Sequence, residues 1–158
     1  MDLTFPTPSE MFNVRVAVAI VHDGRLLVQG DHHYPFVVPP GGRCRLHEST
    51  ADAARREIRE ELACDVAIGR LLWLVENFFE LDGRRVHELT FVYEGRLPAD
   101  APFVATEGDF LGAEDNPRLF YRWVPLPEHA TLELYPEVLR GAADGFPAST
   151  ERVVVRTS

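Results

Sequence analysis

The sequence predicts an α+β fold. Two observations support it: apolar residues alternate with other residues over short stretches before residue 29 and after residue 70, and the residues between them include the pattern of a capped helix. Alternation with a period of two indicates strands, whereas apolar residues three or four apart indicate an amphipathic helix. The length of 158 residues and the 46% of hydrophobic residues suit one core, so we expect a single domain over residues 1–158.

A hairpin is predicted near the start of the chain. Residues 1–11 form a polar, proline-containing arm with little pattern, and valine or isoleucine then occupies every second position over residues 14–20. Asp23 and Gly24 separate this strand from a second apolar run at residues 26–28. An Asp-Gly pair between two apolar runs is the strongest short-range signal of a hairpin.

A helix is predicted after a glycine turn. Residues 31–38 form a loop that ends in an extended segment, and two prolines followed by two glycines at residues 39–42 stop that segment and supply a flexible turn. Ser49 or Thr50 can cap a helix that runs to about Leu62.

Two further strands are predicted at residues 71–80 and 86–94, joined by residues 81–85. Apolar and aromatic residues occupy alternate positions in both. His87 and Glu88 are neighbours on the second of these strands, so their side chains must point to opposite faces of the sheet.

The last third of the chain is less regular. Residues 97–117 lack periodicity, and a loop of that length in a compact domain is usually functional or disordered. A strand follows at residues 119–124. A last helix begins within residues 134–140, with Pro136 in its first turn, and residues 151–156 form a valine-rich segment that can pair with a sheet edge.

The charge and composition exclude several classes of protein. A net charge of −9 argues against a protein that grips nucleic acid polymers. No run is long and apolar enough to span a membrane, and the first residues lack a signal sequence, so we expect no membrane partner and a cytoplasmic location. Two cysteines, Cys44 and Cys64, are too few for a disulfide scaffold and are expected to be free thiols.

Three glutamates cluster on the predicted helix. Glu57, Glu60 and Glu61 fall within a sector of about 100°, because an α-helix turns about 100° per residue. Like charges three or four residues apart repel by about 0.2–0.5 kcal/mol per pair, and the chain has no lysine to relieve them. A hard divalent cation such as Mg²⁺ would compensate for this repulsion. A solvated acidic face is the alternative interpretation.

The spacing of residues around this cluster favours the metal site. The residues at fixed positions are Gly42, Glu48, Arg56, Glu57, Ile58, Glu60 and Glu61. Together they resemble the Nudix box, the signature of the Nudix hydrolase superfamily. The box covers residues 42–64 here and departs from the family at its end, where Ala63 replaces the usual glycine and Cys64 an aliphatic residue. Alanine can adopt the positive φ of a helix C-cap at a cost of about 1 kcal/mol.

The resemblance implies a fold, a reaction and a metal. The implied fold is an α/β/α sandwich, a mixed β-sheet between helices, and the implied reaction is hydrolysis of a phosphoanhydride bond with Mg²⁺, or with Mn²⁺ in its place. Glu60 and Glu61 would be the principal ligands, Glu57 a ligand or proton acceptor, and a backbone carbonyl near Gly42 would join them. Arg56 would be an orienting partner, paired with Glu48.

The resemblance also points to residues outside the box. A further carboxylate from a loop before the last strands often completes such sites, and the candidates are Glu107, Asp109, Glu114 and Asp115. We favour Glu114, which lies shortly before the strand at residues 119–124. Aromatic side chains near the substrate can stack on a base. The substrate contacts that we expect are therefore Tyr34, Phe78 and Phe79, together with Arg84 in the turn between two strands.

Two other functions are compatible with the same fold. A catalytically quiet Nudix-like module would bind a nucleotide without cutting it, although such a module has no need to tolerate three repelling glutamates. A prenyl diphosphate isomerase would need a further catalytic cysteine, and neither Cys44 nor Cys64 fits. The substrate is expected to be a nucleoside diphosphate linked to another group or a nucleoside triphosphate. No second signature selects among these, and a homodimer is one of the oligomeric states expected from the resemblance.

Overall fold

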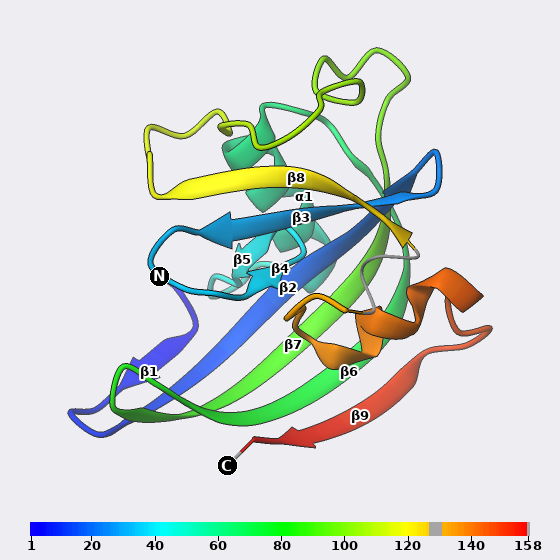
Figure 1. The fold of residues 1–158 in the computed structure, drawn as a ribbon. Helices are drawn as coiled ribbons and strands as arrows, with labels where there is room; N and C mark the ends of the chain where they lie inside the picture. Colours follow the sequence, from blue (N-terminus) through cyan, green and yellow to red (C-terminus); the bar gives the residue numbers. More distant parts are fainter. Residues whose placement is uncertain (127–130, 158) are drawn as a thin grey trace.

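The computed structural model describes residues 1–126 and 131–157. Within these residues it contains nine strands, one α-helix and one 3₁₀ helix (Figure 1). In chain order they are β1 (Thr4–Pro6), β2 (Glu10–His22), β3 (Arg25–Asp31), β4 (Val37–Val38), β5 (Gly41–Arg43), α1 (Thr50–Leu62), β6 (Ala67–Leu81), β7 (Arg84–Arg96), β8 (Leu119–Pro125), η1 (Glu137–Asp144) and β9 (Glu151–Arg156).

Strand β2 lies at the centre of a mixed sheet. It pairs in parallel with β7 and antiparallel with β1, β3 and β5. The sheet runs in the order β4-β3-β2-β7-β6-β9, and β8 pairs with β3. The terminal strand β9 pairs in parallel with the long strand β6, which confirms the prediction that residues 151–156 join a sheet edge.

Strands β2 and β3 separate soon after the hairpin turn. The predicted Asp-Gly turn is confirmed, because Asp23 and Gly24 both have positive φ, at 49° and 70°. Only two residue pairs then join β2 to β3, and further along β2 the short strand β5 takes the neighbouring position. The glycine segment was expected to be a flexible turn, and this was wrong, since Gly41 and Gly42 lie in β5 with extended backbone.

Helix α1 follows the sequence prediction closely. The Ser49 hydroxyl accepts a hydrogen bond from the Asp52 backbone N–H at 3.1 Å, which is the expected N-cap. The helix ends at Leu62, and Ala63 adopts the left-handed conformation with φ 50° and ψ 39°. The Ala63 N–H donates to the Arg59 carbonyl at 3.0 Å, so alanine does fill the position where the family has glycine.

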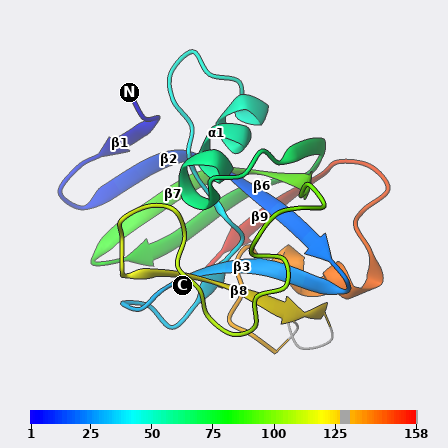
Figure 2. The same cartoon turned by 90° about the horizontal axis from the view of Figure 1, so that it is seen from above.

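The core consists of two layers of buried side chains, one on each face of the sheet. Figure 2 shows α1 on one side of the sheet and the 3₁₀ helix on the other. Val16, Val18 and Ile20 of β2 pack in the layer that includes α1. Ala17 and Ala19, which alternate with them, pack in the layer that includes η1. This is the expected sandwich with one difference: the last helix is the 3₁₀ helix η1, which begins after Pro136, and not an α-helix.

Other parts of the chain differ in detail from the predictions. The arm at residues 1–11 shows little pattern in the sequence, and the structure contains β1 there, paired with β2 through three residue pairs. Residues 97–117 contain no helix or strand, as predicted. Cys44 and Cys64 are buried free thiols. No helix within residues 1–126 and 131–157 is long and apolar enough to cross a membrane.

Candidate active site

The three helix glutamates differ in how deeply they lie in the protein. Glu61 is 5% exposed and faces the interior. The Glu57 side chain is 14% exposed and the Glu60 side chain 38% exposed. The three carboxylates of α1 therefore differ in burial: Glu61 lies in the core, Glu57 is partly buried and Glu60 lies at the surface.

Arg56 holds the loop before α1 against the helix. Its guanidinium forms a bidentate pair with Glu48, with N–O distances of 2.6 and 3.0 Å, and its Nη2 donates to the Arg43 carbonyl at 2.9 Å. The hydrogen bonds from Arg56 lower the pKa of Glu48. This pairing of Glu48 with Arg56 was expected from the resemblance and is confirmed. Arg56 also contacts Glu57 at 2.8 Å and Glu60 at 3.3 Å.

Gly42 leaves room for the Glu57 carboxylate. A Cβ atom at position 42 would lie 2.3 Å from the Cδ and Oε2 atoms of Glu57. No side chain fits at that distance without displacing the carboxylate. Position 42 therefore requires glycine because the Glu57 carboxylate approaches it closely. The backbone conformation does not require glycine, since Gly42 has no positive φ.

Glu61 lies close to two polar residues of the paired strands β3 and β8. The Gln29 side-chain amide on β3 donates to Glu61 Oε1 at 3.1 Å and to the Tyr121 hydroxyl on β8 at 2.8 Å. Glu61 Oε2 is buried and has no hydrogen-bond partner among the described residues. Burial, together with the charges of Glu57 and Glu114, raises the pKa of Glu61 to about 8, although the Gln29 hydrogen bond opposes this.

The irregular loop at residues 97–117 contacts the end of α1. The Ala113 N–H donates to the Glu61 carbonyl at 2.6 Å, which fixes the loop against the end of α1. The charge of the neighbouring Glu114 acts on Glu61. Two other candidates face arginines elsewhere, since Glu107 lies 3.5 Å from Arg25 and Asp109 forms a bidentate pair with Arg122. Asp115 is exposed.

The carboxylates around Glu61 are oxygen donors of the kind that a hard divalent cation prefers. Glu61 has a buried oxygen without a partner, and two further carboxylates act on it electrostatically. In the described part of the chain, however, no three acidic, imidazole or thiol groups converge in an arrangement that could hold a metal ion. Glu57 and Glu60 direct oxygens to Arg56, so coordination by all three glutamates requires these two side chains to turn away from the guanidinium.

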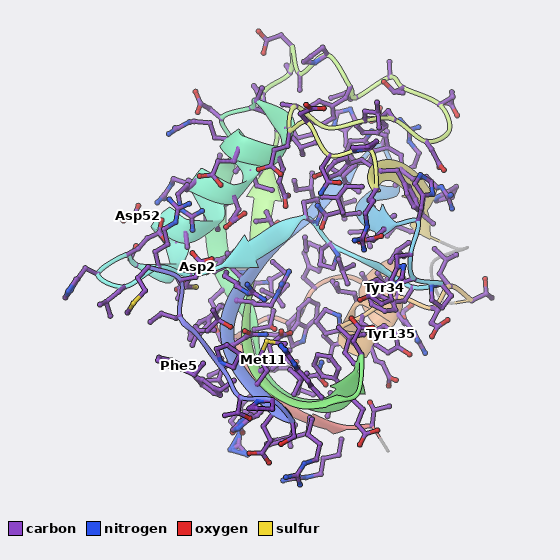
Figure 3. The ribbon with its side chains drawn as sticks, turned by 90° about the vertical axis from the view of Figure 1, so that its left-hand side faces the viewer. Asp2, Phe5, Met11, Tyr34, Asp52 and Tyr135 are labelled. Carbon is purple, nitrogen blue, oxygen red and sulfur yellow. The ribbon has the colours of Figure 1, made fainter. Side chains whose placement is uncertain are left out.

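Tyr34, one of the expected substrate contacts, contacts the turn that precedes Arg84, another of them and the first residue of β7. The Tyr34 hydroxyl donates to Asp82 Oδ2 at 2.5 Å, and Asp82 lies in the turn that also leads to Arg84. The Tyr34 ring stacks on Phe36, which has an edge contact with Tyr135. Figure 3 shows Tyr34 and Tyr135 together on the side of the molecule away from Asp52 of α1. No contact joins these aromatic rings to the helix glutamates in the described residues.

Phe78 and Phe79 are the other expected substrate contacts. They line a cavity of about 740 Å³ near the end of β6 and the start of β7. The lining also includes Phe5 and Met11, which Figure 3 shows below Asp2. None of the helix glutamates lines it. The Phe78 ring stacks on His87 at 4.3 Å, whereas Glu88 contacts Arg15, Asn13 and Thr90. His87 and Glu88 therefore face opposite sides of the sheet, as predicted.

Several polar residues near the glutamates were not predicted from the sequence. Gln29 follows a run of three buried apolar residues in β3, and Arg15 lies between two valines in β2. A polar residue in an otherwise apolar strand was the available signal. Its partner could not be inferred, because Gln29 reaches Glu61 and Tyr121 across 32 and 92 positions of the chain.

Comparison with known proteins gives a family match and structural neighbours. The sequence model of the NUDIX domain family matches residues 11–142. A MutT protein from Bacillus halodurans superposes with a TM-score of 0.63 at 15% identity, covering 91% of this chain and 90% of that one. An ADP-ribose pyrophosphatase from Streptococcus suis superposes with a TM-score of 0.55 at 15% identity, covering 90% and 98%.

A NUDIX hydrolase from Nitrosomonas europaea superposes with a TM-score of 0.61 at 16% identity, covering 92% of this chain and 79% of that one. At these identities the superpositions establish a shared fold. No functionally curated protein matches the sequence.

Proposed function

The chain belongs to the NUDIX domain family, and we propose that this Nudix pyrophosphohydrolase uses Mg²⁺ to cleave a phosphoanhydride bond. The substrate would be a nucleoside diphosphate linked to another group, or a nucleoside triphosphate. The observation that carries the proposal is the buried Glu61 carboxylate, which has an unpartnered oxygen and lies within the electrostatic reach of Glu57 and Glu114.

Glu57, Glu60 and Glu61 are the residues that would hold the cation, with a backbone carbonyl near Gly42 as a further ligand. A bound Mg²⁺ or Mn²⁺ neutralises phosphate charge and polarises the phosphoryl group. The three carboxylates lie on one helix whose start is fixed by the Ser49 cap and by the Arg56–Glu48 pair. This local order supports their assignment as ligands.

Glu114 is proposed as the general base, with Glu57 as the alternative. The oxygen of a water attacks phosphorus, the bridging P–O bond breaks, and the electron pair leaves with the departing phosphate. The carboxylate accepts the proton that the water loses. Glu114 is supported by its position one residue after Ala113, whose N–H is bonded to the Glu61 carbonyl.

The names of the structural neighbours support a small nucleotide derivative as the substrate, because one is described as an ADP-ribose pyrophosphatase and another as a UDP-X diphosphatase. The net charge of −9 supports a small substrate over a nucleic acid polymer. We further propose that residues 1–158 form one domain that acts in the cytoplasm. A homodimer is a testable oligomeric state.

A substrate panel tests the proposal directly. Nucleoside triphosphates, ADP-ribose, other nucleoside diphosphate derivatives and dinucleoside polyphosphates are incubated with the protein and Mg²⁺, with and without EDTA. We expect release of phosphate, pyrophosphate or a nucleoside monophosphate that EDTA abolishes. Nucleotide binding without turnover across the panel would instead indicate a nucleotide-binding module, and turnover that persists in EDTA would contradict the role of the cation.

A further inference from the structure

We propose that Arg15 and Arg43 together form a binding site for phosphate oxygens beside the helix glutamates. The ligand class is a phosphate or diphosphate anion, and in the enzyme it would be the phosphate chain of the substrate. The inference therefore rests on the proposed function for the identity of the ligand, but not for the existence of the anion site.

The two arginines are direct neighbours across two strands. Arg15 of β2 is paired with Arg43 of β5 in the antiparallel register. Side chains at directly opposite positions project from the same face of the sheet, with Cβ atoms about 4.5–5.5 Å apart. Like charges in this arrangement destabilise the folded protein unless something compensates for them.

The described residues offer this pair few direct ion-pair partners. The nearest carboxylate of Arg15 is that of Glu88, with an Nε–Oε2 distance of 3.9 Å. The Glu88 oxygens already accept hydrogen bonds from Asn13, at 3.4 Å, and from Thr90, at 3.2 Å. The one carboxylate recorded beside this pair is therefore distant from Arg15 and already accepts two hydrogen bonds.

Arg43 is the less satisfied of the two arginines. Its Nε is buried without a hydrogen-bond partner, and in the described part of the chain its guanidinium makes no hydrogen bond or ion pair. Arg56, by contrast, contacts three carboxylates and a carbonyl. A buried donor without a partner is costly, so an acceptor from outside the chain is the natural complement of Arg43.

The position of the pair suits a phosphoanhydride substrate. Gly42 is packed against the Glu57 carboxylate, and Arg43, the next residue of β5, projects from the opposite face of the strand, which it shares with Arg15. The charge of Arg15 still acts on both Glu57 and Glu61. Guanidinium groups bind phosphate oxygens through paired N–H donors. Cationic groups for one phosphate would thus lie across β5 from the acidic groups proposed to hold the cation for another.

Binding of inorganic pyrophosphate, measured by calorimetry in EDTA, tests the site without metal or turnover. The variants are Arg43→Gln, Arg43→Lys and the double variant Arg15→Gln/Arg43→Gln. Arg55→Gln is the matched control, because Arg55 is an exposed arginine of α1 paired with Asp52. We expect Arg43→Gln to weaken binding at least tenfold, the double variant to abolish it, Arg43→Lys to fall between these and the wild type, and Arg55→Gln to bind as the wild type does.

Thermal unfolding shows whether each variant is folded. We expect Arg43→Gln to unfold at or above the wild-type temperature in the absence of ligand, because the substitution removes one of two like charges while the Arg43 carbonyl that accepts from Arg56 remains. Unchanged pyrophosphate binding in folded Arg43→Gln or Arg43→Lys, absence of binding to the wild type, or equal weakening in Arg55→Gln would overturn the proposal.

The same variants separate this inference from the proposed function. If the wild type binds pyrophosphate through the two arginines but hydrolyses no nucleotide with Mg²⁺, the anion site stands and the proposed reaction fails. If the enzyme hydrolyses nucleotides and Arg43→Gln has a wild-type KM, the reaction stands and the anion site fails.

Discussion

Glu61→Gln is the most informative substitution, because it removes a charge that the metal-free protein tolerates poorly. Burial, with Glu57 and Glu114 nearby, raises the pKa of Glu61 from an ordinary 4.5 to about 8. The folded protein therefore holds a proton at Glu61 over a pH range in which the unfolded chain has released it. Stability falls with rising pH wherever the folded state binds more protons than the unfolded state.

The size of the effect follows from the two pKa values. One pKa unit corresponds to about 1.36 kcal/mol, so the raised pKa of Glu61 lowers the free energy of unfolding by about 1 kcal/mol at pH 5 and about 5 kcal/mol at pH 9. The cost is absent below pH 4.5 and complete above pH 8. Glutamine keeps the shape and has no charge, so Glu61→Gln should gain about 4 kcal/mol relative to the wild type between pH 5 and pH 9.

Urea unfolding in EDTA at pH 5, 7 and 9 measures this difference. Glu80→Gln, at an exposed position of β6, controls for the removal of one negative charge.

Mg²⁺ at about 100 times its dissociation constant should stabilise the wild type by about 2.7 kcal/mol and leave Glu61→Gln unchanged. Turnover of the variant should fall by about 100-fold or more. Parallel stability curves for wild type and variant would refute the electrostatic reasoning, and wild-type turnover would refute the metal-ligand role.

Three further substitutions test the structure around the site. Gly42→Ala should lower turnover at least about tenfold and change the free energy of unfolding by less than about 1 kcal/mol. The reason is that the new Cβ displaces only the end of the Glu57 side chain. Unchanged kinetics would contradict the close approach of Glu57 to Gly42. Arg56→Lys should cost about 1–3 kcal/mol in urea unfolding, because lysine cannot make the bidentate pair with Glu48, and a smaller loss would show that charge alone suffices. Ala63→Gly should stabilise the protein by about 1 kcal/mol and raise Tm by about 2–4 °C, since Ala63 has φ 50°; a lower Tm would contradict the assigned cap geometry.

The sequence predicted best what depends on neighbours along the chain. The Ser49 cap, the end of α1 at Leu62 and the Asp23–Gly24 turn all follow from residues within a few positions of each other. The Arg56–Glu48 pair was expected from the resemblance to the Nudix box, and the structure contains it.

What depends on strand register could not be predicted. The pairing of Arg15 with Arg43 and the contact of Gln29 with Glu61 arise because β2 and β3 separate and β5 takes the vacated position beside β2. The last helix was predicted from Pro136 near its first turn, and the structure shows it as a 3₁₀ helix. Its eight residues lie between Pro136 and Gly145, and Gly141 among them lowers the propensity for a regular α-helix.

The terminal strand β9 has a consequence for self-association. It is the last strand of the sheet order, so its outer edge offers unpaired backbone groups to another chain. On one of its faces Arg152 and Arg156 flank Val154, which is 43% exposed. These two positive charges repel the same charges of a second copy that approaches β9. The edge strand β9 therefore opposes aggregation through strand addition.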